Sequence, residues 1–212
     1  MIVGGGTGGV GVAAMLRNQG VKNITVIEPS QFHYYQPLWT LVGGGVYSNT
    51  KSRRPMKDIM PKGANWIAQG VSGFEPKQNK VTLEDGQEVE YDYLVVAAGL
   101  KSDFTAIPGM QEGLETKNSG VVSLYNYNYS SKVYEEFTAI CRDRLQKGMK
   151  TDMIFTMPTT TLKCAGAPQK IMWLLEDTLR SEGLRTLANI QFIVPGTYYT
   201  DDDDNTPIFT PP

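Results

Sequence analysis

The chain has 212 residues and nearly balanced charges, with 20 Lys and Arg against 22 Asp and Glu. This balance argues against nucleic acid as a partner, because polyanion binding usually requires a surplus of basic residues. No apolar run approaches the roughly 20 residues of a membrane-spanning helix. The only two cysteines, Cys141 and Cys164, are too few for a disulfide scaffold and favour reduced thiols or a redox pair.

The first third of the chain has the pattern of a βαβ unit. A strand ending at Ile2-Val3 leads into the turn Gly4-Gly5-Gly6-Thr7-Gly8-Gly9, followed by a helix from Val10 to Asn18 and a strand from Asn23 to Glu28. Glycines in this spacing let a pyrophosphate approach the backbone at a helix N-terminus, and an acid about 20 residues later binds ribose hydroxyls. Glu28 would also repel a 2′-phosphate. The pattern predicts a dinucleotide site.

The segments that follow favour FAD over NAD. A loop of aromatics and glycines covers Phe32 to Gly45, and an antiparallel meander from Val71 to Tyr91 turns at Asp85-Gly86. The apolar run from Tyr93 to Gly99 predicts a parallel strand buried on both faces. An NAD domain usually continues directly with further βαβ units. A meander at this point is typical of two-dinucleotide flavoproteins of the glutathione reductase type, whose small-residue turn approaches FAD.

Composition shifts near Ile107-Pro108-Gly109, and the residues beyond form a second, partial βαβ pattern. A helix is predicted from Ser131 to Gly148, with Val133, Phe137, Ile140, Cys141 and Leu145 on its apolar stripe. The remaining predicted elements are a strand at Thr151–Met157, a loop at Pro158–Pro168, a helix at Gln169–Glu182 and a strand at Asn189–Val194. The fold class is therefore α/β: an FAD/NAD(P)-binding Rossmann-like domain with a small meander, plus part of a second Rossmann-like domain.

A cysteine occupies the loop where a second glycine fingerprint would bind NAD(P)H. Cys164 lies four residues before Pro168, where the next helix is expected to begin, and Lys163 precedes it. A helix N-terminus and a lysine both favour a thiolate, which suggests thiol redox chemistry without a nicotinamide. From spacing alone, a small buried loop residue is an equally good interpretation of Cys164. Cys141 is interpreted as a packing residue of its helix.

Three segments carry a resemblance to the sulfide:quinone oxidoreductases of the eukaryotic mitochondrial type. They are 3–9, 26–43 and 163–172, and the similarity extends over roughly residues 2 to 194. The resemblance implies that sulfide is oxidised through a cysteine persulfide, that electrons pass through FAD to ubiquinone, and that glutathione or sulfite accepts the sulfur. It also implies location at the mitochondrial inner membrane, with a C-terminal part in contact with the membrane surface.

The resemblance and the glycine motif together give the expected site. Cys164 matches the first redox cysteine of the family, and no metal site is expected. The expected FAD contacts are Gly4, Gly6, Thr7, Gly8, Gly9, Glu28, Gln36, Val71 and Gly99. His33, the only histidine, is more readily interpreted as packing against Tyr34 or Tyr35 than as a general base.

Several features depart from the family pattern. The second redox cysteine, the flavin-closing motif and the membrane-binding helices have no counterpart, the segment from Val121 to Ser131 resembles an insertion, and Asp201–Asp204 resembles a solvated tail. We therefore expect a fragment or truncated gene model that does not turn over alone, with domains at 1–112 and 113–197 and an acidic tail at 198–212. The alternatives are a non-catalytic FAD-binding fragment and a type II NADH:quinone dehydrogenase-like flavoprotein, which would need a second glycine fingerprint.

Overall fold

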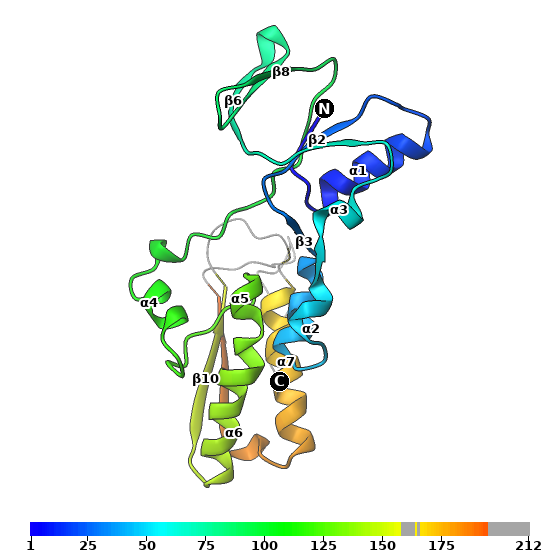
Figure 1. The fold of residues 1–212 in the computed structure, drawn as a ribbon. Helices are drawn as coiled ribbons and strands as arrows, with labels where there is room; N and C mark the ends of the chain where they lie inside the picture. The colour runs from blue at the N-terminus through cyan, green and yellow to red at the C-terminus, as the bar shows by residue number, and fades with distance from the viewer. Residues whose placement is uncertain (158–163, 165, 195–212) are drawn as a thin grey trace, which may run out of the picture. The chain divides into compact units, whose positions relative to one another are not determined.

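The structure is a computed structural model that describes residues 1–157, 164 and 166–194 (Figure 1). Residue contacts divide the chain into two compact units. Unit 1 comprises Met1–Gln36 and Thr50–Lys101, and unit 2 comprises Pro37–Asn49 and the described residues from Ser102 onward. The predicted domain boundary at residue 112 stays a prediction, because contact units need not coincide with domains. The predicted acidic tail, 198–212, lies outside the described residues.

Unit 1 contains a four-stranded parallel sheet in the order β5 (Asn65–Ile67), β2 (Thr25–Ile27), β1 (Ile2–Val3) and β9 (Val95–Val96). The helix α1 (Thr7–Asn18) connects β1 to β2 and packs Ala13 against Ile2, Ile24 and Val26. The predicted βαβ unit is thus confirmed. The helix begins three residues earlier than predicted, at Thr7, so the last glycines of the turn form its first helical turn.

The strand predicted from Tyr93 to Gly99 is much shorter than expected. Only Val95–Val96 is a strand, and the side chain of Val96 is 59% exposed, so the prediction of burial on both faces is wrong. The physical reason is position: β9 lies at an edge of the sheet and pairs only with β1 among the described strands. The ladder ends with a hydrogen bond of 2.7 Å from the Ala97 amide to the Val3 carbonyl.

The meander predicted between Val71 and Tyr91 is confirmed. It is a three-stranded antiparallel sheet of β6 (Val71–Glu75), β7 (Lys80–Leu83) and β8 (Glu88–Glu90), with the short helix η3 (Pro76–Gln78) between the first two strands. Val81 and Leu83 are fully buried and form a core cluster with residues of β1 and β2. Burial of this apolar face stabilises the meander on the parallel sheet.

The segment predicted as a loop from Phe32 to Gly45 contains regular structure, so this prediction is wrong. β3 (Phe32–Tyr34) pairs antiparallel with β4 (Arg53–Pro55) in unit 1. η1 (Gln36–Leu38) leads into the helix α2 (Trp39–Gly43) of unit 2, and η2 (Asn49–Ser52) returns the chain to unit 1, where α3 (Met56–Ile59) lies beyond β4. Trp39 and Val42 are buried, so apolar packing supports a short helix despite its glycine-rich end.

Unit 2 is a second βαβ unit preceded by short helices. β10 (Thr151–Thr156) and β11 (Ala188–Ile193) pair in parallel along their whole length, and α7 (Ala167–Ser181) connects them, as predicted. The other elements are η4 (Phe104–Ala106), α4 (Met110–Glu115), α5 (Tyr127–Ser130), η5 (Val133–Thr138), α6 (Ala139–Gln146) and η6 (Arg185–Leu187). Its core joins α7 to β10 through Leu175, Leu179 and Met153.

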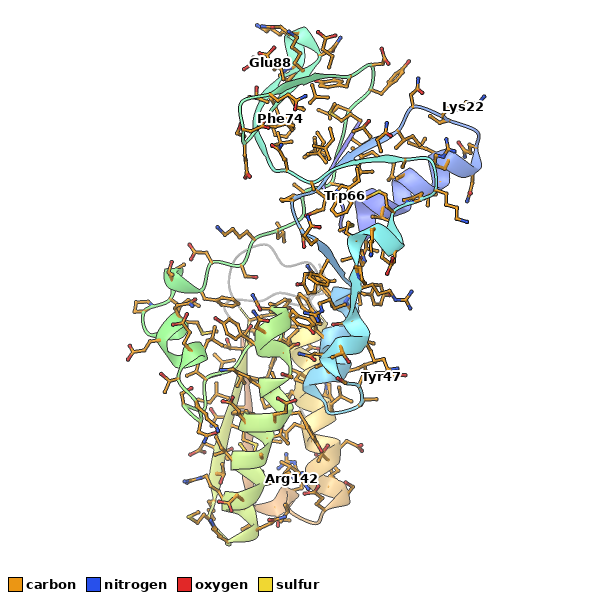
Figure 2. The ribbon with its side chains drawn as sticks, in the orientation of Figure 1. Lys22, Tyr47, Trp66, Phe74, Glu88 and Arg142 are labelled. Carbon is orange, nitrogen blue, oxygen red and sulfur yellow. The ribbon has the colours of Figure 1, made fainter. Side chains whose placement is uncertain are left out.

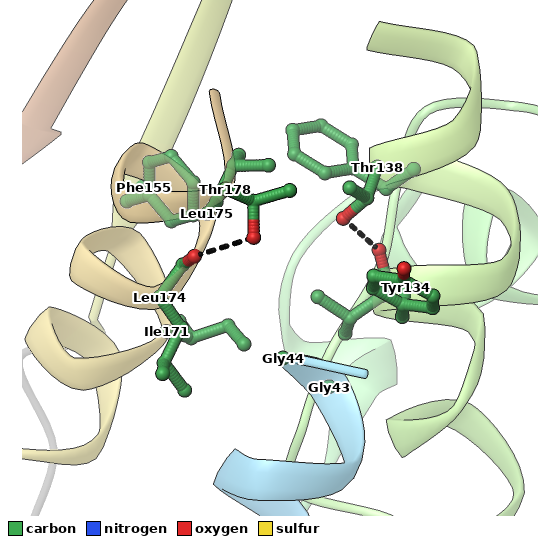
Figure 3. Close-up of a pocket in the computed structure, with 11 residues that line it drawn as sticks. Gly43, Gly44, Tyr134, Thr138, Phe155, Ile171, Leu174, Leu175 and Thr178 are labelled. Carbon is green, nitrogen blue, oxygen red and sulfur yellow. Dashed lines mark hydrogen bonds between the residues drawn. The ribbon is translucent and has the colours of Figure 1, made fainter. Parts of the chain in front are cut away.

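The helix predicted from Ser131 to Gly148 contains a π-helical turn, η5, which the sequence did not predict. The Thr138 hydroxyl donates a hydrogen bond of 2.8 Å to the carbonyl of Val133 within it. Cys141 and Leu145 of the predicted stripe are buried, whereas Phe137 is half-buried and meets Phe155 edge to face. A small apolar cavity separates η5 from α7 and the glycine end of α2 (Figure 3).

Candidate dinucleotide site and thiol

The glycine loop lies at the carboxyl end of β1, between the ends of its neighbours β2 and β9. The Gly4 amide donates to the Ile27 carbonyl at 2.9 Å, and its φ of +102° is a conformation that glycine adopts readily. A Cβ atom on Gly4 would lie 2.3 Å from the Ala97 carbonyl oxygen, and one on Gly9 would lie 1.8 Å from the Gly4 carbonyl oxygen. The turn and the close approach of α1 to β1 therefore both require glycine.

The N-terminus of α1 is arranged to receive an anion. Gly6 precedes the helix in an extended conformation, no side chain caps the helix, and its first turn holds no acidic residue. A Cβ atom on Gly6 would meet nothing within 4 Å, so the space in front of the first turn is open. Helix N-termini whose first backbone N–H groups point into open space bind phosphate groups. This geometry fits the pyrophosphate of a dinucleotide.

The carboxylate of Glu28 is fixed at the end of β2. Its Oε2 accepts a hydrogen bond of 2.7 Å from the Gly5 amide, and its Oε1 accepts one of 2.8 Å from the Ser30 amide. Each carboxylate oxygen can accept a further hydrogen bond. The group is half-buried next to the glycine loop, so both oxygens are in fixed positions for a ribose diol.

Three neighbours of this site were not predicted from the sequence. The Trp66 indole N–H donates to the Glu28 carbonyl at 2.8 Å, and the Ser30 amide supports the carboxylate. His33, which the sequence placed against neighbouring tyrosines, has its Nδ1 3.3 Å from the carbonyl oxygen of Gly5. In the sequence, only Ser30 could have been found, because it lies two residues after Glu28. Trp66 and His33 reach the site through strand pairing, which the sequence does not show.

The remaining predicted FAD contacts lie elsewhere in the described structure. Val71 is the partly buried first residue of β6, and Gly99 is an exposed residue with a φ of +74° three residues after β9. Gln36 is exposed at the start of η1. The structure thus brings the glycine loop and Glu28 together, whereas contacts of FAD with Val71, Gly99 and Gln36 stay predictions.

The thiol predicted as redox-active belongs to unit 2. Cys164 is exposed, and its carbonyl accepts hydrogen bonds of 3.3 Å from the Tyr125 hydroxyl and the Ala167 amide, directly before α7. The interpretation of Cys164 as a buried loop residue is therefore wrong. The pKa of Tyr125 is raised to about 12, mainly because the hydroxyl is partly buried and to a smaller extent because Cys164 lies nearby. Lys163, which was predicted to favour the thiolate, lies outside the described residues.

Cys141 is the opposite case, as predicted. It is 4% exposed and packs in the core of unit 2 with Leu145. Burial raises the pKa of its thiol to about 11, partly offset by Arg144. A protonated thiol in the core is a poor nucleophile, so Cys141 is a packing residue.

Neither a metal centre nor a membrane span is found in the part of the chain that the structure describes. No group of three or more His, Cys, Asp or Glu side chains is placed to hold a metal ion there. Among the same residues, no helix combines the length and apolar character needed to cross a bilayer.

The family model of the pyridine nucleotide-disulphide oxidoreductases matches residues 1–132, the part that carries the glycine loop, Glu28 and the meander. The chain belongs to this family. The predicted Rossmann-like fold is thereby confirmed, and it is the fold that positions a dinucleotide at the carboxyl edge of a parallel sheet. Pyridine nucleotide-disulphide oxidoreductases typically bind FAD.

Within the family, the chain is similar to mitochondrial sulfide:quinone oxidoreductases, as its sequence predicted. The protein of Dictyostelium discoideum is 44% identical over 195 residues, which are 91% of this chain and 41% of the relative. The mouse protein is 39% identical over 193 residues, with the same two shares. This family member thus spans about two fifths of the length of these curated relatives.

The fold is shared with a solved structure from the same group. The X-ray structure of the sulfide:quinone oxidoreductase of Aquifex aeolicus superimposes with a TM-score of 0.70 at 23% identity. The match covers 93% of this chain and 43% of that one. The family fold therefore extends over both units, including the βαβ unit that carries Cys164.

Proposed function

We propose that this chain forms the flavin-binding and sulfur-accepting part of a sulfide:quinone oxidoreductase. The observation that carries the proposal is the exposed Cys164 directly before α7, in a chain 44% identical to a mitochondrial sulfide:quinone oxidoreductase. A nicotinamide-dependent relative would be expected to carry a glycine fingerprint in this stretch, which instead reads Lys163-Cys164-Ala165-Gly166.

FAD is the proposed cofactor, and the residues of unit 1 fit it. The amides at the start of α1 would bind its pyrophosphate, with Gly4, Gly6, Thr7, Gly8 and Gly9 allowing the backbone to approach. The Glu28 carboxylate would accept the hydroxyls of the adenosine ribose. When bound, FAD supplies a two-electron acceptor. Val71, Gln36 and Gly99 are the further proposed contacts.

Cys164 would hold the sulfur atom during oxidation. The Cys164 thiol and one molecule of hydrogen sulfide form a new S–S bond and release two electrons and two protons, which leaves a persulfide on Cys164. FAD, held by the glycine loop and Glu28, would supply the two-electron oxidant for this step, and a quinone would be the final acceptor. The outer sulfur passes to a thiol or sulfite acceptor, which restores the Cys164 thiol. The exposure of Cys164 allows both hydrogen sulfide and an acceptor to reach it.

The names of the relatives support a quinone as the electron acceptor and a mitochondrial location. Ubiquinone as that quinone, glutathione or sulfite as the sulfur acceptor, and contact with the inner membrane are proposed as what the family resemblance implies. The absence of a second glycine fingerprint in the sequence disfavours an NADH:quinone dehydrogenase.

The test is a spectrum of the purified chain loaded with FAD, recorded anaerobically before and after addition of sulfide. We expect a single reductive half-reaction rather than turnover: the visible flavin band should bleach, and the mass of the peptide containing Cys164 should increase by one sulfur atom. Cys164→Ser should abolish both changes, whereas Cys141→Ser, the control on the buried thiol, should retain them. A chain that binds no FAD, or one whose bleaching survives Cys164→Ser, would contradict the proposal.

A further inference from the structure

Glu28 is held through its backbone as well as through its carboxylate. Its amide donates to the Ile67 carbonyl at 3.0 Å, which closes the ladder between β2 and β5. Its carbonyl accepts the indole N–H of Trp66 at 2.8 Å. Trp66, labelled in Figure 2, is the central residue of β5 and is paired in register with Val26.

The hydrogen bond from Trp66 orients a peptide group that has no N–H of its own to anchor it. Pro29 follows Glu28 and has no amide hydrogen, so the peptide group between them offers only its carbonyl oxygen. The indole fixes that carbonyl and hence the direction in which the chain leaves β2. Two residues later, the Ser30 amide donates to Oε1 of the Glu28 carboxylate. Trp66 is thus connected to the carboxylate through the peptide that it orients.

The Gly5 amide holds Oε2 of the carboxylate in place. The Ser30 amide then sets the rotation of the carboxylate plane through its hydrogen bond to Oε1. A ribose diol requires this, because two adjacent hydroxyls bind a carboxylate only when its plane is correctly oriented. From this arrangement we infer that Trp66 is a positioning residue, which directs the Glu28 carboxylate toward the 2′- and 3′-hydroxyls of the adenosine ribose. The inference rests on the proposed FAD site.

The test measures hydroxyl recognition apart from overall affinity. ADP and 2′-deoxy-ADP are titrated calorimetrically into the full chain freed of flavin. We expect ADP to bind about tenfold more tightly than 2′-deoxy-ADP, because one charge-assisted hydrogen bond distinguishes them. Trp66→Phe keeps an aromatic ring without the N–H, and the preference should fall to about threefold or less. A purely structural loss would weaken both ligands equally and leave the preference unchanged.

Two further variants separate the possible failures. Glu28→Gln should abolish the preference, and Trp173→Phe, which changes an exposed tryptophan of unit 2, should leave it unchanged. Absence of ADP binding by the unaltered chain, or an undiminished preference in Glu28→Gln, overturns the proposed FAD site itself. An undiminished preference in Trp66→Phe alone overturns the role of Trp66.

If Trp66→Phe does not fold, the same titration uses a chain with benzothienylalanine at position 66. This amino acid keeps the shape of the indole and replaces its N–H by sulfur. A reduced preference for ADP supports the role of the N–H, and an unchanged preference overturns it.

Discussion

Burial controls the ionisation of Cys141 and makes the stability of unit 2 depend on pH. The pKa of its thiol rises from 9.0 to about 11 in the folded chain. Because the folded state retains the proton more strongly, this contribution is fully present below pH 9 and is lost as pH rises through about 11. We expect unfolding by urea to show a stability loss of at most about 3 kcal/mol from this group.

Cys141→Ala isolates that contribution. The variant loses packing at every pH, but its stability should decline less steeply than that of the unaltered chain between about pH 8 and about pH 11. Tyr125, whose pKa is also raised, titrates in both proteins, so its effect cancels in the comparison. Parallel pH profiles for the two proteins would show that Cys141 does not titrate differently on folding.

At the same scale, the sequence predicted the parts of the candidate site that depend on local spacing. The glycine turn and Glu28 each follow from neighbouring residues in a motif, whereas local spacing left open whether Cys164 is buried or exposed. Trp66 and His33 could not be predicted, because they reach the site through the pairing of β5 with β2 and of β3 with β4. Strand pairing joins residues distant in sequence, which no local pattern encodes.

At the scale of the element, α1 contains two glycines of which one has no room for a side chain and the other has ample room. A Cβ atom on Gly9 would lie 1.8 Å from the backbone oxygen of Gly4, whereas one on Gly11 would meet nothing within 4 Å. We expect Gly9→Ala to lower the free energy of unfolding by at least about 2 kcal/mol, since a backbone clash must be relieved. Gly11→Ala should raise it by about 0.5 to 1 kcal/mol through helix propensity.

Thermal unfolding of both variants, with FAD titration, checks this expectation. Gly9→Ala should also weaken FAD binding, because separating α1 from β1 moves the first-turn amides, and Gly11→Ala should leave it unchanged. Equal effects of the two substitutions on stability would contradict the close approach of α1 to β1.

Elements stabilised by periodic apolar residues were predicted well, and those stabilised by distant contacts were not. α7 carries a regular buried stripe that includes Ile171, Leu175 and Leu179, and its existence followed from that pattern. The helix α2 has only five residues and ends at Gly43, so its sequence alone favours a loop. Its buried Trp39 and Val42 stabilise it through packing that the sequence does not reveal.

At the scale of the whole molecule, each unit has its own hydrophobic core. One core, from Leu124 to Ala188, lies entirely in unit 2, and two clusters around Val26 and Val81 lie in unit 1. Separate cores predict that a substitution inside one unit mainly destabilises that unit. Hydrogen exchange, which reports local opening of backbone amides, can distinguish the two units in the intact chain.

The buried carboxylate of Glu176 provides such a substitution in unit 2. Its side chain is 10% exposed, and its Oε1 accepts hydrogen bonds of 2.5 Å from Arg180 and 2.9 Å from Arg185. Glu176→Ala leaves the less exposed guanidinium, that of Arg185, without this partner, so we expect unit 2 to lose about 1 to 2 kcal/mol of stability. Exchange should accelerate in β10, α7 and β11.

Asp143→Ala is the matched control, because it removes an ion pair from the same unit in which both side chains are about 60% exposed. Exposed pairs of this kind contribute at most about 0.5 kcal/mol, so exchange should hardly change. Protection in β1, β2 and α1 should stay constant in both variants, since Glu176 and Asp143 both lie in unit 2. Accelerated exchange throughout unit 1 in Glu176→Ala would show instead that the two units unfold as one cooperative body, and that a substitution in unit 2 also destabilises the dinucleotide site.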